Sequence, residues 1–142
     1  FYVVPRSVVQ ARAGARMGNA FGSELKAFDL TLSEWRVCVS LLSAPDQTLS
    51  ELAPHAGTKI SAVSRIVDRL AQQGLVIRTP SASDGRSIHM RLTDKGMALT
   101  KKIVPFARDY EAIALTGFSA AEITALKDML NRIYANAKNL AG

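Results

Sequence analysis

The chain has 142 residues, of which 48% are hydrophobic and 21% are charged, so it can fold around a core of its own and is not a disordered tail. No apolar run approaches the roughly 18 residues that a membrane span needs. The chain has one cysteine, Cys38, and two histidines, which excludes an intramolecular disulfide framework and a cluster with zinc-ligand spacing. A single thiol fits the reducing cytoplasm, where we expect the protein to act.

The formal net charge is +6, and the positive charge is concentrated in the middle of the chain. Residues 57–92 carry six cations against two anions, whereas residues 29–56 carry one cation against four anions. A basic segment on a small globular protein favours a polyanionic partner. The charge alone is equally compatible with a role in solubility. The local sequence pattern has to decide between solubility and a polyanionic partner.

The first predicted element is a helix over about residues 8–28, with Gly14, Gly18 and Gly22 at every fourth position. Glycine weakens a helix relative to alanine, but it also lets another backbone approach closely. Close helix packing, for example between subunits, and a frayed helix are therefore both open interpretations.

Two capping boxes of the form Ser/Thr-x-x-Glu follow, beginning at Thr31 and at Thr48. They predict a helix from about Leu32 that ends before Ala44-Pro45, and a short helix that ends near residues 55–57. A third box at Ser119 predicts a last helix to about residue 139. Before it, residue 93 or 94 should cap a long helix that reaches about residue 115.

A further helix is predicted over residues 59–73, directly after a turn at Gly57. Its apolar residues share one face, at spacings of three and four: Ile60, Val63, Val67 and Leu70. The opposite face is small and polar in its first turn and cationic further along, which suits entry into a major groove. Arg65 can fork onto guanine O6 and N7, and Arg69 is better placed for a phosphate.

A β-hairpin is predicted next, with strands over about residues 75–80 and 88–92. The Asp84-Gly85 pair between them is a strong turn signal, because glycine supplies a positive φ and Asp can cap the turn. Arg86 would lie at or beside the tip, where it can enter a minor groove. Asp84 and Arg86 could instead pin the hairpin by pairing with Arg78 or with each other.

These segments resemble the MarR family of bacterial winged helix-turn-helix regulators. The resemblance rests on LTLSEWRV (residues 30–37), TLSELA (48–53), SxVSRxVxxLxxxGLVxR (61–78), DGR (84–86) and LTxxG (92–96), in continuous register. It implies a mainly α fold with a small β-hairpin wing. It also implies an N-terminal dimerisation helix (1–29), a winged DNA-binding lobe (30–93) and C-terminal dimerisation helices (94–142).

The resemblance further implies a homodimer on a pseudo-palindromic operator, with the predicted helix in the major groove and the wing in the minor groove. One recognition helix reads too few bases for a specific site, so a dimer is also physically sensible. The expected DNA contacts are Thr58, Lys59, Ser61, Ala62, Ser64, Arg65, Arg69, Arg86 and Ser87, and the residues expected to shape the wing are Asp84, Gly85 and Arg78.

Many members of the family release DNA when a small aromatic or phenolic acid binds between the dimer helices and the DNA-binding lobe. By this analogy the candidate ligand residues are Arg12, Arg16, Met17, Trp35, Cys38 and Phe106, with Arg16 as the carboxylate partner. Trp35, Cys38 and Phe106 could instead simply be core residues. Other family members sense oxidants through a cysteine, but Cys38 lies in an apolar stretch where a thiol tends to be inert.

We therefore expect a sequence-specific transcriptional regulator, most simply a repressor, that needs no cofactor. A non-specific architectural DNA binder and a Cys38-based redox sensor remain the alternatives. An enzyme is not expected, because His55 and His89 are accompanied by no nucleophile elbow, phosphate loop or paired metal ligands.

Overall fold

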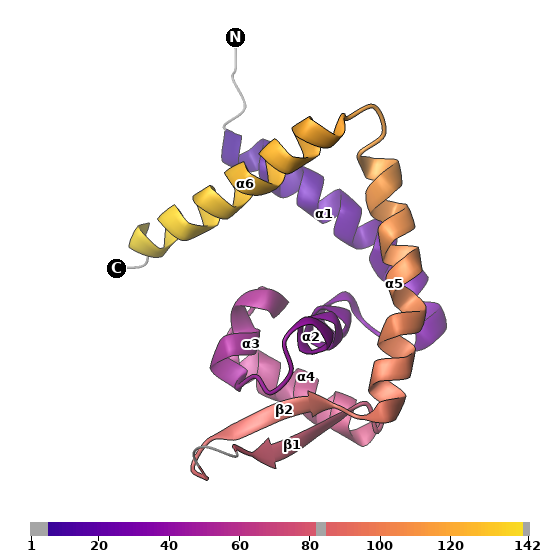
Figure 1. Cartoon of the computed structure of the whole chain (residues 1–142), viewed down its shortest axis with the longest axis vertical. Coiled ribbons are helices and arrows are strands. Elements are labelled where there is room, and N and C mark those ends of the chain that lie inside the picture. The colour runs from indigo at the N-terminus through magenta and orange to yellow at the C-terminus, as the bar shows by residue number, and fades with distance from the viewer. Residues whose placement is uncertain (1–5, 82–84, 141–142) are drawn as a thin grey trace. The chain divides into compact units, whose positions relative to one another are not determined.

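A computed structural model describes residues 6–81 and 85–140, with side chains from residue 12 onward. The described part is mainly helical with one two-stranded antiparallel sheet, which confirms the predicted fold class (Figure 1). The elements are α1 (Arg6–Leu25), η1 (Lys26–Phe28), α2 (Leu32–Ser43), α3 (Leu49–Ala56), α4 (Ile60–Gln72), β1 (Val76–Pro80), β2 (Ile88–Leu92), α5 (Asp94–Ala114), α6 (Ala120–Ala137) and η2 (Lys138–Leu140).

The predicted helix starts are confirmed at the level of hydrogen bonds. Thr31, Thr48 and Ser119 each accept a bond from the backbone N–H three residues on, and the glutamate there bonds back to the cap residue. Thr93 Oγ1 accepts from the N–H of Gly96 at 3.0 Å and so caps α5. Because these signals are local, the sequence located them within one or two residues.

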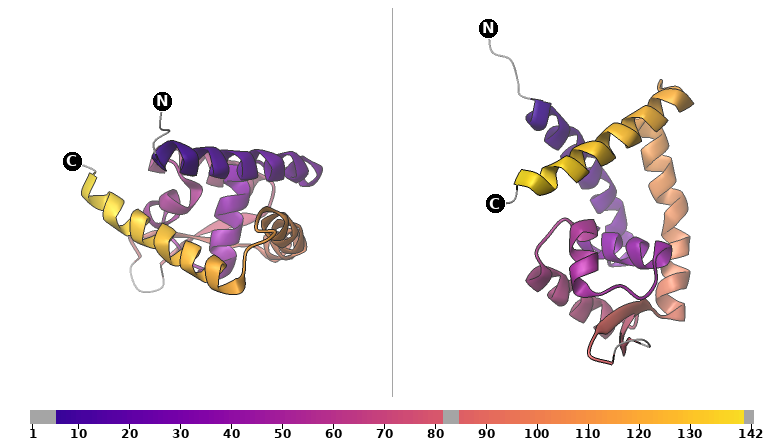
Figure 2. Two further views of the ribbon diagram at one scale, coloured as in Figure 1. Left: turned by 90° about the horizontal axis from the view of Figure 1, so that it is seen from above. Right: turned by 60° about the vertical axis from the view of Figure 1, so that its left-hand side comes forward.

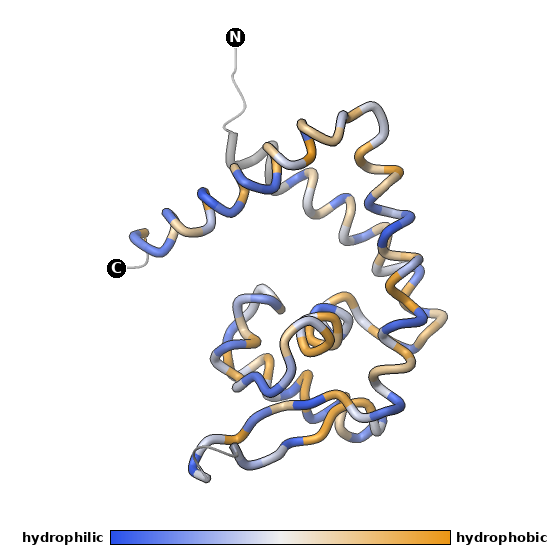
Figure 3. Tube along the Cα trace, in the orientation of Figure 1, coloured by the Kyte–Doolittle hydropathy of each residue, from blue (hydrophilic) through white to orange (hydrophobic). Residues whose placement is uncertain are grey.

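The chain divides into two compact units, Phe1–Ala107 and Arg108–Gly142. In the first unit, α2, α3 and α4 pack together, and the hairpin lies along one side of them (Figures 1 and 2). Hydrophobic positions gather where the three helices meet (Figure 3). Their fully buried side chains include Val37, Leu41, Leu52, Val67 and Leu70.

The helix α4 buries Val63, Val67 and Leu70, as its spacing predicted, but Ile60 is 49% exposed. Ile60 shares the apolar face by its spacing, but it is not buried. Ile60 is the first residue of α4, next to the exposed turn at Gly57. Burial on this face begins only one turn further along, at Val63, which a helical wheel cannot show.

The hairpin is attached to the loop between α2 and α3. Its strands pair from Val76↔Leu92 to Pro80↔Ile88, and the N–H of Met90 also donates to the carbonyl of Gln47 at 2.7 Å. The buried Gln47 amide donates to the carbonyls of Ser40 and Ala44, at 2.9 and 2.6 Å. Strand β2, which lies between β1 and Gln47, is thus joined to the end of α2 through the side chain of Gln47.

Asp46, in the same loop, adopts a left-handed conformation with φ of 62°, which Asp tolerates better than most residues. Its carboxylate accepts from Arg91 Nε at 2.7 Å, and its carbonyl lies 2.6 Å from His89 Nδ1. Both partners are on β2, so the loop holds the strand by side-chain as well as backbone contacts.

Of the three glycines predicted at every fourth position of α1, only one lies against another described element. A Cβ on Gly18 would lie 3.0 Å from Leu32 Cδ2, whereas one on Gly14 or Gly22 would meet nothing within 4 Å. Gly18 therefore sits against α2, and the other two positions are open.

The second unit contains the end of α5, the helix α6 and η2. Lys127 Nζ lies 3.8 Å from Glu111 Oε1, and no side chain of α6 is buried. Large apolar side chains are exposed here, among them Ile113 at 72%, Ile133 at 51% and Tyr134 at 60%. No described helix is long and apolar enough to cross a membrane.

Gly96 provides a test of the packing between α5 and the start of β1. A Cβ at this position would overlap the carbonyl oxygen of Leu75 and lie 2.9 Å from its carbonyl carbon. Since both obstacles are backbone, Gly96→Ala should lower the free energy of unfolding by about 1–3 kcal/mol, measured by urea denaturation at fixed protein concentration. Gly14→Ala, an open helical position, is the control and should be neutral or stabilising. Equal stability of the two variants would contradict this packing.

Candidate nucleic-acid interface

The outer face of α4 presents small and cationic side chains to solvent. Thr58, Lys59, Ser61 and Arg65 are exposed, and Ala62 and Ser64 are partly exposed. Lys59 is the N-cap residue and supplies no side-chain cap, so the first turn keeps backbone N–H groups for an outside acceptor. Such a helix end favours a phosphate.

The arginines of this region differ in what they contact. The guanidinium of Arg65 makes no hydrogen bond or ion pair with the described residues, so it is available to a ligand. Arg69 and Arg78 are both engaged inside the lobe. Sequence reasoning placed Arg65 and Arg69 on one polar face, but only contacts with other elements separate their roles.

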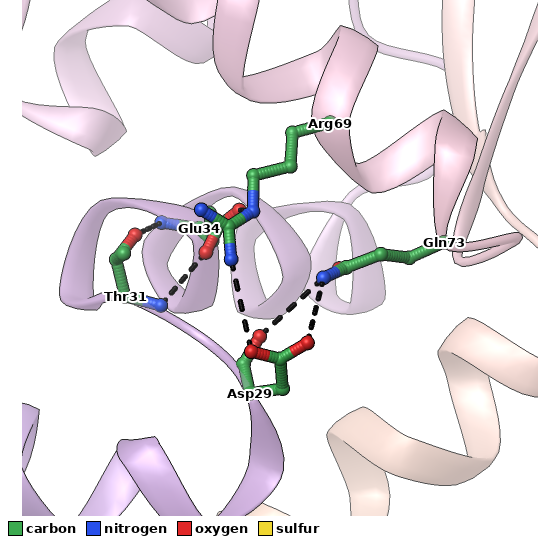
Figure 4. Close-up of polar contacts among 5 residues, drawn as sticks. All are labelled: Asp29, Thr31, Glu34, Arg69 and Gln73. Atoms are coloured by element: carbon green, nitrogen blue, oxygen red, sulfur yellow. Dashed lines mark hydrogen bonds and ion pairs between the residues drawn. The ribbon is translucent and has the colours of Figure 1, made fainter.

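Arg69 ties α4 to the start of α2. Its Nε lies 3.0 Å from Oε2 of Glu34, whose side chain is only 2% exposed, and its Nη2 lies 3.8 Å from Asp29 (Figure 4). The other carboxylate oxygen of Glu34 accepts from the N–H of Thr31 at 2.8 Å and closes the capping box. Gln73 Nε2 adds a 3.3 Å bond to Asp29. One buried carboxylate thus caps α2 and holds the C-terminal half of α4.

Arg78 connects the wing to α4 rather than to the wing tip. Its Nη2 donates to Asp68 and lies 3.4 Å from the carbonyl oxygen of Ser64. The partners of Arg78 in the described part of the chain are thus on α4, and its contacts do not depend on pairing with Asp84 or Arg86. It can still shape the wing, because it fixes the angle at which β1 leaves the helix.

The tip of the wing is described only in part. Asp84 lies outside the described residues, so its expected turn-capping role stays a prediction. Gly85 and Arg86 are exposed and Ser87 is partly exposed. The N–H of Ser81 donates to the carbonyl of Ser87 at 2.9 Å, which closes the hairpin beyond the last strand pair. Arg86 is therefore presented at the end of a closed hairpin.

The candidate ligand residues are divided between surface and core. Arg12, Arg16 and Met17 are exposed on α1, and the two arginines line a shallow hollow together with Ala13, Ala15 and Asn19. Trp35 is 6% exposed and packs edge-on against Phe21, with ring centroids 5.7 Å apart. Phe106 is half-exposed and contacts Phe28. The lining of the hollow includes none of the three candidates Trp35, Cys38 and Phe106.

Cys38 is buried, and burial raises the pKa of its thiol to about 12. A hydrogen bond with Thr100 lowers this pKa and the charge of Glu34 raises it, but desolvation is the largest cause. The thiol stays protonated at neutral pH, which disfavours reaction with oxidants because the thiolate is the reactive form. The described residues contain no group of three potential metal ligands.

The contrast between Arg65 and Arg69 gives a direct test. Arg69→Gln should lower the free energy of unfolding by about 1–3 kcal/mol, because it leaves the buried Glu34 carboxylate without its counter-charge. Arg65→Gln, the matched control, should change it by less than about 0.5 kcal/mol. Denaturant titrations of both variants at one protein concentration make the comparison. A neutral Arg69→Gln would show that the ion pair does not hold α4.

The comparisons with known proteins agree with this geometry. Residues 30–88 match the family model described as MarR family. The chain is 30% identical over 130 residues to the HTH-type transcriptional repressor IacR of Pseudomonas putida, over 92% of this chain and 78% of that protein. It is 32% identical over 130 residues to the HTH-type transcriptional repressor Rv2887 of Mycobacterium tuberculosis, over 91% and 93% respectively.

Three solved structures share the fold. A MarR family transcriptional regulator from Silicibacter pomeroyi has a TM-score of 0.87 at 24% identity, over 92% of this chain and 88% of that chain. Bordetella bronchiseptica BpsR, whose DNA binding is regulated by 6-hydroxynicotinic acid, has a TM-score of 0.81 at 22% identity, over 94% and 96%. A mutant MarR from E. coli complexed with operator DNA has a TM-score of 0.77 at 23% identity, over 92% and 94%.

The family model covers the winged-helix segment, and the curated relatives are matched over most of their length at 30% identity or more. The resemblance seen in the sequence is thereby confirmed, and the family consists of regulators rather than enzymes. The chain belongs to the MarR family of DNA-binding transcriptional regulators.

Proposed function

We propose that the protein is a repressor that binds a pseudo-palindromic operator as a homodimer, with α4 in the major groove and the wing in the minor groove. The observation that carries the proposal is the free guanidinium of Arg65 on the exposed face of a helix that is fixed from behind. An arginine on a helix held in this way can form two hydrogen bonds with the O6 and N7 atoms of guanine, and fixing the helix in advance limits the ordering cost of binding.

The other contacts follow from the same orientation. Thr58, Lys59 and Ser61 surround the uncapped start of α4 and suit backbone phosphates, and Ala62 and Ser64 are small enough to let the helix approach the bases. Arg86 and Ser87 suit the minor groove. We leave Arg69 out of the contact set, because its charge is already used by Glu34 and Asp29.

The exposed apolar side chains of the second unit support the homodimer. A helix in which no side chain is buried, and which exposes Met129, Leu130, Ile133 and Tyr134, lacks the burial that stabilises a helix in water. A second copy of the chain would supply that burial. Dimerisation would also place two α4 helices on one duplex, as a specific site requires.

We further propose that a small aromatic or phenolic acid releases the repressor from DNA. The support is analogy with BpsR, whose DNA binding is regulated by 6-hydroxynicotinic acid. By the same analogy, the exposed side chains of Arg12, Arg16 and Met17 form the anion site. The burial of Cys38 makes redox control the weaker alternative.

Competition binding tests the operator proposal. The labelled DNA is the segment upstream of the protein's own coding region, and the competitor is unrelated duplex at moderate salt. A regulator should prefer its site by roughly a thousandfold or more, whereas an architectural protein would bind both equally. Arg65→Ala should cost about 1–3 kcal/mol on the specific site and almost nothing on competitor DNA. Equal loss on both would contradict a base contact by Arg65.

The exposed Ile60 gives a second prediction on specificity. An apolar side chain at the start of a recognition helix can contact the C5-methyl group of thymine. Replacing each thymine of the site in turn by deoxyuracil should reveal one position per half-site where loss of the methyl weakens binding about fourfold. Ile60→Ala should be insensitive to that replacement. The idea fails if Ile60→Ala distinguishes thymine from uracil as the unaltered protein does.

A further inference from the structure

The C-terminal end of α4 is attached to the segment that connects α1 to α2. Asp29 lies in that segment, between η1 and α2, and has a left-handed backbone with φ of 56°. Its carboxylate accepts from Gln73 Nε2 at 3.3 Å, and its carbonyl oxygen lies 3.5 Å from the same nitrogen (Figure 4). Gln73 is the C-cap residue of α4. The last side chain of the predicted recognition helix therefore binds the link from α1.

The backbone of the same glutamine is bound by α5. Lys95 Nζ, in the first turn of α5, donates to the carbonyl of Gln73 at 2.9 Å. The helix α5 also meets the link from α1 directly, because Phe28, the neighbour of Asp29, packs against Phe106 with ring centroids 5.8 Å apart. The end of α4 is thus attached both to the helix that precedes the DNA-binding lobe and to the helix that follows it.

The side-chain amide of Gln73 has one orientation that suits the contact with Asp29. With Nε2 toward Asp29, the amide oxygen is buried and has no hydrogen-bond partner among the described residues. The reverse orientation would place that oxygen against the Asp29 carboxylate, and both groups are acceptors. An unpaired buried oxygen costs free energy. The contact offsets little of that cost, because water competes for a carboxylate whose side chain is 86% exposed. This balance favours a role in orienting α4 over a role in stability.

We propose that Asp29 and Gln73 are positioning residues that fix α4 relative to α1 and α5, and so limit the half-site spacing that the dimer accepts. The ion pair of Glu34 with Arg69 attaches α4 to α2, inside the lobe. The Asp29–Gln73 contact attaches α4 to the helices predicted to join the two lobes. One added base pair moves a half-site by about 3.4 Å and turns it by about 35°, and a fixed α4 cannot follow. The role in spacing rests on the homodimer and operator proposed above, but the contact does not.

Two pairs of variants separate orientation from stability. Asp29→Gly keeps a left-handed backbone and removes the acceptor, whereas Asp29→Asn keeps both the backbone and an acceptor oxygen. Gln73→Met removes the donor at similar size. Gln72→Met is its control, because the Gln72 side chain is exposed and makes no hydrogen bond in the part of the chain that the structure describes. Gln73→Met and Gln72→Met should unfold at the same urea concentration.

Hydrogen exchange on the free protein tests the contact itself. The backbone N–H of Gly74 donates to the carbonyl of Ala71 at 3.0 Å and closes the end of α4. Its protection factor should fall at least about threefold in Gln73→Met and in Asp29→Gly, and should stay within about twofold in Asp29→Asn and Gln72→Met. Unchanged protection in both Gln73→Met and Asp29→Gly would overturn the contact.

Spacing preference is then measured on the specific site in the upstream segment, with one base pair removed from or added to its centre. The unaltered protein, Asp29→Asn and Gln72→Met should bind the altered sites at least about thirtyfold more weakly than the natural site. Gln73→Met and Asp29→Gly should reduce this ratio at least about fivefold. A ratio that neither variant changes would refute the role in spacing. An unaltered protein that prefers no DNA sequence, or ignores the spacing, would refute the proposed operator, and the exchange data would still decide on the contact.

Discussion

The ion pair between Glu34 and Arg69 is the interaction on which the DNA-binding lobe depends. A carboxylate that is 98% removed from solvent would be costly without a counter-charge, and Arg69 supplies that charge from the far half of α4. The same carboxylate completes the cap of α2, so the start of one helix and the orientation of the next are fixed together (Figure 4). Arg65, one turn earlier, is left free for a ligand.

The wing is held in a comparable way from the opposite end of α2. Gln47 and Asp46 bind β2 through backbone and side-chain bonds, and Arg78 binds β1 to Asp68 on α4. The helix α4 and the wing are therefore both attached to α2 or to the loop that follows it. This shared attachment explains how two short elements can keep a fixed orientation relative to each other.

The sequence was sufficient for features that are decided locally. Three capping boxes, the glycine turn at Gly57 and the alternation of the hairpin placed nearly every element within one or two residues. It was insufficient where contacts between distant segments decide. Nothing in the spacing of α4 shows that Arg69 faces a buried carboxylate 35 positions earlier, or that Ile60 extends beyond its packing partners. The capping-box spacing predicted that Glu34 bonds to Thr31, but nothing in the sequence predicted its contact with Arg69.

A double-mutant cycle on Glu34 and Arg69 tests the central claim most directly. Glutamine at either position removes one charge, and at position 34 it keeps an acceptor for the N–H of Thr31. The free energy of unfolding is measured for the original chain, Glu34→Gln, Arg69→Gln and the double variant at one protein concentration. The account predicts a coupling energy of about 1 kcal/mol or more. Additive effects, with a coupling near zero, would contradict it.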